Sequence, residues 1–204
     1  MTLTSQAVLA ELDTTLPQAS ESWRSTALRQ VVDLFLSGAE IYSNEQIALF
    51  DEVMRRLIPS ADRLLLAELS NQLAPLGNTP VKVLGMLARH MDMAVCGPVI
   101  EQAKAVPDKD LAEAADRDRV DLHLLMKIAA RPQLGETVTD VLLKRGNAAI
   151  QRSIIDNPNA RISEAGYARL VMGLNGDKNL ATAIAARDDL PAELRPWLAA
   201  TLGQ

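Results

Sequence analysis

Apolar positions recur at helical spacing along nearly the whole chain. The segment 43–57 shows the pattern at four positions: Ile47, Phe50, Met54 and Leu57. Intervals of three or four residues place such side chains on one face of a helix. Ser43, with Gln46 three residues later, forms the capping box that starts a helix. Alternating strand patterns are nearly absent, so the chain is predicted to be all-α.

Four helices are expected before residue 75, and short ones after it. The four are a short helix at 5–12, a helix capped by Ser20 or Ser22 and ended by Gly38, and helices at 43–57 and 62–73. The shorter ones are roughly 80–90, 96–105, 108–115, 119–130, 135–145, 147–156, 163–174, 178–186 and 191–202. Proline or aspartate marks most of the loops between them. A helix of two or three turns is unstable alone and must pack against its neighbours.

A four-residue phrase, Ile-Ala-Ala-Arg, occurs at 128–131 and again at 184–187. A degenerate copy at 154–158 lies about halfway between the two. This period is typical of helical repeat arrays, in which each unit contacts only its neighbours. We therefore predict an α-α superhelix, a HEAT-like array of short helix pairs over 78–204. It follows an N-terminal helical bundle over 1–77, and the two form either continuous domains or one single domain.

Charge and composition restrict the classes of function. The net charge is −5 and the pI about 5.1, and residues after position 60 include 17 bases and 18 acids. A nucleic-acid-binding protein usually shows a basic excess, so nucleic acid is an unlikely partner. The chain shows no signal-peptide pattern and no apolar run that would span a membrane. With a single cysteine it forms no internal disulfide, and we expect a cytoplasmic protein with no membrane association.

Three features are candidate interaction surfaces. His123, Lys127 and Arg131 are spaced by four residues and are expected on one helix face. That face would either bind an acidic partner or be a solvated face with Arg131 reaching a helix end. The acidic run Asp108, Asp110 and Glu113 is either a solvated face or a docking surface for a basic partner.

The third feature is Trp23, the aromatic residue of the first quarter that we expect to be partly exposed. The other three aromatic residues there are expected in a core: Phe35, Tyr42 and Phe50.

No catalytic, cofactor or metal motif is present in the sequence. The chain lacks a glycine-rich phosphate loop and a nucleophile elbow, and its two histidines and one cysteine lack paired ligand spacing. Neither catalytic nor cofactor-binding nor metal-binding residues are predicted. Because an arginine recurs at 131 and 187, we expect it to brace an interhelix loop against a carboxylate.

Several phrases together resemble the DUF2336 family of uncharacterised bacterial proteins. They lie at 33–39, 45–53, 73–80, 128–132, 138–142 and 145–147. The resemblance covers about residues 25–175 and departs at the charged stretch 114–121. It implies an all-helical, HEAT-like array and a bacterial source, and it implies no activity, substrate or catalytic residue.

The sequence therefore favours a noncatalytic scaffold or adaptor that binds another protein of unknown identity. A nucleic-acid-acting HEAT-like protein and a HEAT-like enzyme with an unrecognised active site are the alternatives. A homodimer is a further alternative for the partner.

Overall fold

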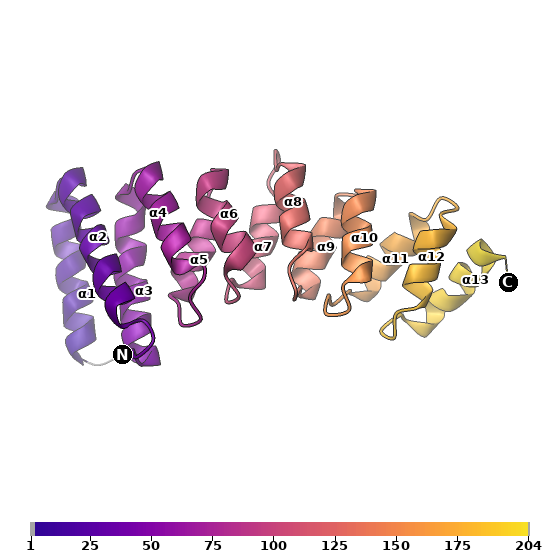
Figure 1. Cartoon of the computed structure of the whole chain (residues 1–204), viewed down its shortest axis with the longest axis horizontal. Helices are drawn as coiled ribbons and strands as arrows, with labels where there is room; N and C mark the ends of the chain where they lie inside the picture. Colours follow the sequence, from indigo (N-terminus) through magenta and orange to yellow (C-terminus); the bar gives the residue numbers. More distant parts are fainter. Residues whose placement is uncertain (1–2, 204) are drawn as a thin grey trace. The chain divides into compact units, whose positions relative to one another are not determined.

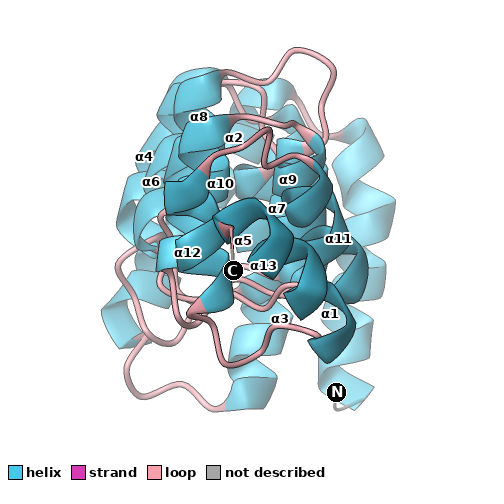
Figure 2. Ribbon diagram, turned by 90° about the vertical axis from the view of Figure 1, so that its right-hand side faces the viewer, coloured by secondary structure: helices cyan, strands magenta, loops and turns pink. Residues whose placement is uncertain are grey.

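The computed structural model of the protein describes residues 3–203. Within that range it contains thirteen α-helices, three short 3-10 helices and no β-strand. Figure 2 shows these residues as helices joined by loops. The predicted all-α fold with packed helix pairs is confirmed. By its internal contacts the chain divides into two compact units, residues 1–110 and 111–204.

The first unit arranges its helices in two layers, shown in indigo to magenta in Figure 1. One layer packs α2 on α4 and α4 on α6, and the other packs α1 on α3 and α3 on α5. The bounds are α1 (Leu3–Thr15), α2 (Glu21–Gly38), α3 (Asn44–Leu57), α4 (Arg63–Leu73), α5 (Val81–Ala88) and α6 (Met93–Gln102). Short 3-10 helices, η1 (Leu16–Gln18) and η2 (Ile58–Ser60), follow α1 and α3.

Local sequence signals set most helix starts in this unit. The capping box of α3 is formed as predicted: the Gln46 amide donates to Ser43 Oγ at 3.3 Å, and the Ser43 amide donates to Gln46 Oε1 at 2.9 Å. Of the two candidate caps for α2, Ser20 is the one that accepts the Trp23 amide. Asp62 caps α4 in the same way.

Three of the four early aromatic rings form one cluster in this unit, with Phe35 in the core and Tyr42 and Phe50 half-buried at its edge. Phe35 is fully buried, and its ring centroid lies 5.3 Å from that of Phe50. Tyr42 packs 5.1 Å from Phe50. Trp23 is 48% exposed, as expected from its position near the start of α2.

The second unit repeats the two-layer arrangement with shorter helices. One layer packs α8 on α10 and α10 on α12, and α9 packs on α11 in the other. The bounds are α7 (Asp108–Ala115, which begins in the first unit), α8 (Leu122–Ala129), α9 (Glu136–Lys144), α10 (Ala148–Asp156), α11 (Glu164–Met172), α12 (Lys178–Ala185), η3 (Ala192–Leu194) and α13 (Arg195–Leu202). Helices of eight or nine residues confirm the predicted two to three turns.

A regular register underlies the repeated phrase. The helices α8, α10 and α12 are each capped by an Asx side chain, namely Asp121, Asn147 and Asp177. Ten residues after each cap lie Arg131, Asn157 and Arg187, and three residues further lie the buried Leu134, Ala160 and Leu190. The degenerate copy near 154–158 therefore occupies the same structural place as the two Ile-Ala-Ala-Arg phrases.

Several helix boundaries differ from those predicted: α1 is longer than the expected 5–12, and α6 begins three residues before the expected 96–105 because Asp92 caps it. Two further differences have an equally local cause. The helix expected at 119–130 begins at Leu122, because Asp121 caps it and 119–121 precede the cap. The last helix, expected from 191, is preceded by a 3-10 turn and begins at Arg195, because Pro196 fits the first turn of an α-helix. The domain boundary predicted at 77/78 lies inside the first compact unit and stays a prediction.

Candidate functional site

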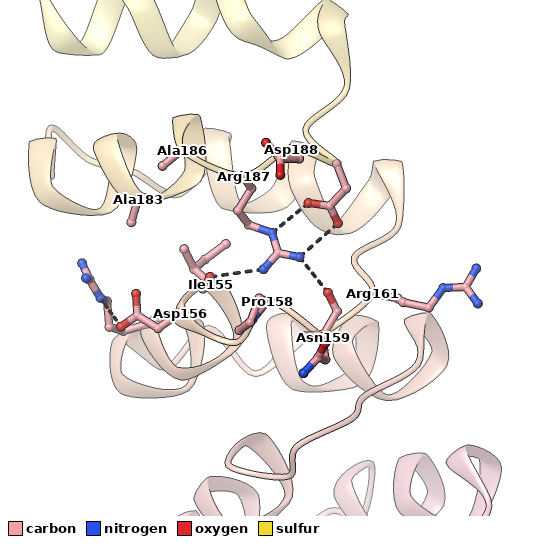
Figure 3. A pocket seen from close by; sticks show the side chains of 12 residues that line it. Ile155, Asp156, Pro158, Asn159, Arg161, Ala183, Ala186, Arg187 and Asp188 are labelled. Atoms are coloured by element: carbon pink, nitrogen blue, oxygen red, sulfur yellow. Dashed lines mark hydrogen bonds and ion pairs between the residues drawn. The ribbon is translucent and has the colours of Figure 1, made fainter.

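A groove of about 620 Å³ opens on the second unit, where the loop after α10 approaches α12 and the loop that follows it. Its twelve lining residues are Arg152, Ile155, Asp156, Pro158, Asn159, Ala160, Arg161, Ala183, Ala186, Arg187, Asp188 and Asp189. Figure 3 shows the guanidinium of Arg187 among Ile155, Pro158 and Asn159. The groove therefore joins two copies of the repeated phrase.

Arg187 lies two residues beyond the end of α12 and reaches back to the preceding repeat. Its Nη1 donates to the carbonyl oxygens of Ile155 at 3.2 Å and Asn157 at 2.8 Å, and its Nη2 donates to that of Ala160 at 2.7 Å. These three carbonyls belong to the end of α10 and the loop after it. The arginine thus fixes that loop against α12.

The same guanidinium holds a carboxylate and a phenol. Arg187 Nε and Nη2 donate to the two oxygens of Asp189 at 2.9 and 3.0 Å, and Nε also donates to the Tyr167 hydroxyl at 2.7 Å. Tyr167 in turn donates to Asp189 at 2.5 Å. The predicted bracing of a loop against a carboxylate is confirmed for Arg187.

Burial and charge act together on these three groups. Burial raises the pKa of Tyr167 to about 12, with the hydrogen bond to Asp189 adding to the effect. Burial opposes the charged form of Arg187, but Asp189 and Tyr167 outweigh it and raise the pKa of the guanidinium. Burial also opposes ionisation of Asp189, yet the bonds from Arg187 and Tyr167 hold its pKa below the usual range. At neutral pH Arg187 and Asp189 are therefore a charged pair, and the neutral Tyr167 hydroxyl is hydrogen-bonded to both.

The remaining charges lie at the rim of the groove. Arg152 pairs with Asp156 one turn later at 2.7 Å, with both side chains half exposed. Arg161 pairs with Glu136 at 3.2 Å and points away from the groove in Figure 3. Exposed ion pairs of this kind contribute little to stability and exchange readily with other partners.

The arrangement offers a shaped surface and little chemistry. A guanidinium has five N–H donors, and every nitrogen of Arg187 is engaged by the chain itself, so none is aimed at a ligand. The lining contains no cysteine, histidine, serine or threonine. Within residues 3–203, no three metal-ligating side chains come together. Between the charges lie small apolar groups, Ala183, Ala186 and Pro158.

The family model described as an uncharacterised protein conserved in bacteria, DUF2336, matches residues 95–204. The chain belongs to the DUF2336 family. The matched region runs from α6 to the C-terminal end and contains the whole groove, whereas the resembling phrases at 33–39, 45–53 and 73–80 lie outside it. No curated protein and no solved structure matches the chain.

In this DUF2336 protein only two of the three basic side chains predicted to share one helix face lie on that helix. His123 is exposed and Lys127 half-buried on α8, but Arg131 lies beyond the helix end at Ala129 and is only 8% exposed. Arg131 therefore does not share an exposed face with the other two, and it occupies the place in the register that Arg187 occupies in its own repeat. An interaction through His123 and Lys127 stays a prediction.

The acidic candidates lie on α7 in two different settings. Asp108 and Glu113 are exposed, whereas Asp110 is half-buried and pairs with Arg89 at 3.1 Å. Asp110 also lies over Gly85, where a β-carbon would collide with its carboxylate. Its geometry therefore serves contact between α5 and α7, and the docking role of the exposed pair stays a prediction.

Sequence reasoning did not find the groove itself. Its lining joins residues about 30 positions apart, and no motif marks that proximity. The sequence did contain one relevant signal, because an arginine recurs at 131 and 187 in the repeated phrase. This recurrence predicted that Arg187 braces a loop, and Arg187 lies at the groove floor. Trp23 lies in the first unit and does not belong to this groove.

Proposed function

We propose that the protein is a noncatalytic scaffold or adaptor, and that the groove between the α10 loop and α12 binds a segment of another protein. The observation that carries this proposal is that every nitrogen of Arg187 already donates hydrogen bonds to groups of the chain itself. The charged group at the floor of the groove is used to fix the groove walls and has no donor for a substrate.

The geometry of the walls supports the same proposal. Protein-binding surfaces that keep their shape lose less entropy on association. The brace holds two loops from successive repeats, so the groove is shaped before a partner arrives. Its small apolar residues, Ala183 and Ala186, leave room for larger side chains of a partner.

The alternatives lack a comparable observation. Residues 111–204 contain 12 bases and 12 acids, so this unit has no basic excess to attract nucleic acid. An enzyme would need converging titratable groups that are free to bond to a substrate. The titratable groups at the groove floor are hydrogen-bonded to one another.

Three further statements belong to the proposal. The helix pairs form a HEAT-like α-α superhelix, the protein acts in the cytoplasm, and the partner is a different protein and not a second copy. No helix among residues 3–203 is long and apolar enough to cross a membrane. Light scattering at high concentration tests the last statement, since a mass near 22.1 kDa excludes a homodimer.

Affinity capture with paired variants tests the groove. Ala183→Glu adds a charged side chain inside the groove, and Thr182→Glu adds the same charge on the adjacent, exposed position of α12 that does not line it. We expect quantitative mass spectrometry to show a captured protein that is lost with Ala183→Glu and kept with Thr182→Glu. Equal capture by both variants would refute the assignment to this groove.

A further inference from the structure

A second groove, of about 300 Å³, lies on the first unit between α3 and the loop that leads into α5. Its wall includes two buried polar residues, Asp51 from α3 and Thr79 from the loop. Asp51 is 6% exposed and Thr79 is 5% exposed. Buried polar side chains are normally satisfied by hydrogen bonds, and these two are satisfied only in part.

Asp51 caps α5 from a neighbouring helix. The N-cap residue of α5 is Pro80, which makes no side-chain cap. Instead Asp51 Oδ2 accepts the Lys82 amide at 3.0 Å, and Asp51 Oδ1 accepts the Val83 amide at 2.8 Å. A carboxylate oxygen accepts two hydrogen bonds, so each oxygen retains one unused position.

The electrostatics show that this capping does not fully compensate the buried charge. Burial raises the pKa of Asp51, although the two amides and the Lys82 ammonium act in the opposite direction. Lys82 itself pairs with Glu52 at 3.5 Å and is about two-thirds exposed. A further cation at the carboxylate would therefore stabilise its charged form.

Thr79 is a second buried polar group whose hydrogen bonds are incomplete. Its Oγ1 is buried and has no hydrogen-bond partner among the described residues. A buried hydroxyl without a partner lowers the stability of the fold, because its hydrogen bonds to water are lost and not replaced. An oxygen of this kind lining a groove is a site where a donor from outside the chain would be favoured.

The rim of the groove is apolar, and its surroundings are acidic. Ala48, Ala105 and Gly77 are exposed lining residues, and Val81 is 40% exposed. Aliphatic side-chain stems bury well along such a rim while the charged head reaches deeper. The first unit carries 9 bases and 14 acids, so the whole net charge of −5 resides there. This charge attracts and orients basic segments of a partner.

We propose that this groove binds an arginine side chain of a partner protein, with its guanidinium on Asp51 and Thr79 and its stem along the apolar rim. A guanidinium suits the site because its planar fork can donate to two acceptors on different elements at once. The site lies on the first unit and is independent of the groove at Arg187, so each proposal can fail without the other.

An NMR titration of the full chain tests the proposal. The probe is a blocked pentapeptide with a central arginine between glycines, compared with the same peptide carrying neutral citrulline and with methylguanidinium alone. We expect the arginine peptide to shift the amide signals of Lys82 and Val83, which donate to Asp51. Citrulline should bind at least about tenfold more weakly, because a charged hydrogen bond and its ion pair are lost.

Two variants and a control complete the test. Thr79→Val keeps the shape, removes only the unpaired hydroxyl and should weaken arginine-peptide binding about tenfold without loss of folding. Asp51→Asn should abolish binding, and Asp33→Asn, which removes an equal charge at an exposed position of α2, should not change it.

Equal binding of arginine and citrulline peptides, or no effect of Thr79→Val, would overturn the proposal. Methylguanidinium that binds as tightly as the peptide would also overturn it, because the site would then take a free cation and not a protein side chain.

Discussion

Replacement of Arg187 by methionine is the sharpest test of the brace. The variant keeps an unbranched side-chain stem and removes bonds to three backbone carbonyls, to both oxygens of Asp189 and to the Tyr167 hydroxyl. The Arg187 side chain is only 9% exposed, so water replaces these bonds incompletely. Breaking a buried ion pair by removing one partner costs about 3–5 kcal/mol.

Asp189 is 47% exposed, so water reaches the freed carboxylate and reduces that cost. We therefore expect Arg187→Met to lower the free energy of unfolding by about 3 kcal/mol. Urea denaturation followed by circular dichroism measures the change. Hydrogen exchange should locate it in the α10–α11 loop, because each repeat contacts only its neighbours.

Arg152→Met is the matched control, since it removes an arginine from the same groove but from a half-exposed pair with Asp156. Its expected cost is below about 1 kcal/mol. If Arg187→Met cost no more than Arg152→Met, or if exchange rose equally throughout the chain, the brace would not hold the groove.

Three further predictions follow from the same contacts. Asn157→Ala removes the donor to the Arg131 carbonyl at 2.8 Å and the acceptor of the Asn159 amide, and should cost about 1–2 kcal/mol in urea denaturation. Hydrogen bonds from Arg55, and also from Arg56, lower the pKa of Glu52 to about 2, so its stabilising contribution is present above about pH 4.5 and is lost as the pH falls towards 2. Glu52→Gln should therefore cost about 1–2 kcal/mol at pH 7 and flatten the loss of stability between those pH values; an unchanged pH profile would contradict this. Fluorescence anisotropy with DNA at low salt should show only weak binding, and tight, steeply salt-dependent binding would revive the nucleic-acid alternative.

Features that depend on a few adjacent residues were predictable from the sequence. The Ser43 and Gln46 capping box is an example, since both partners lie within one turn. The role of Arg187 was also predictable, because the same phrase recurred where only packing and loop support explain its composition. Short helices followed from loops marked by proline or aspartate and from the spacing of the repeated phrases.

Features that depend on distances between helices were not predictable. Asp51 caps a helix that begins thirty residues later, and no local pattern links the two. The burial of Arg131 beyond the end of α8 was likewise not visible in the spacing of four residues that links it to His123 and Lys127. The groove at Arg187 depends on the separation of α10 and α12, which is set by packing of whole repeats.

Photo-crosslinking in living cells tests the central claim, that the groove beside α12 binds another protein, most directly. A photoreactive p-benzoylphenylalanine would replace Ala183 inside the groove and, in the control, Thr182 on the adjacent exposed position. The account predicts a discrete crosslinked protein from position 183 that is absent from position 182. The same crosslinks from both positions, or none from 183, would contradict it.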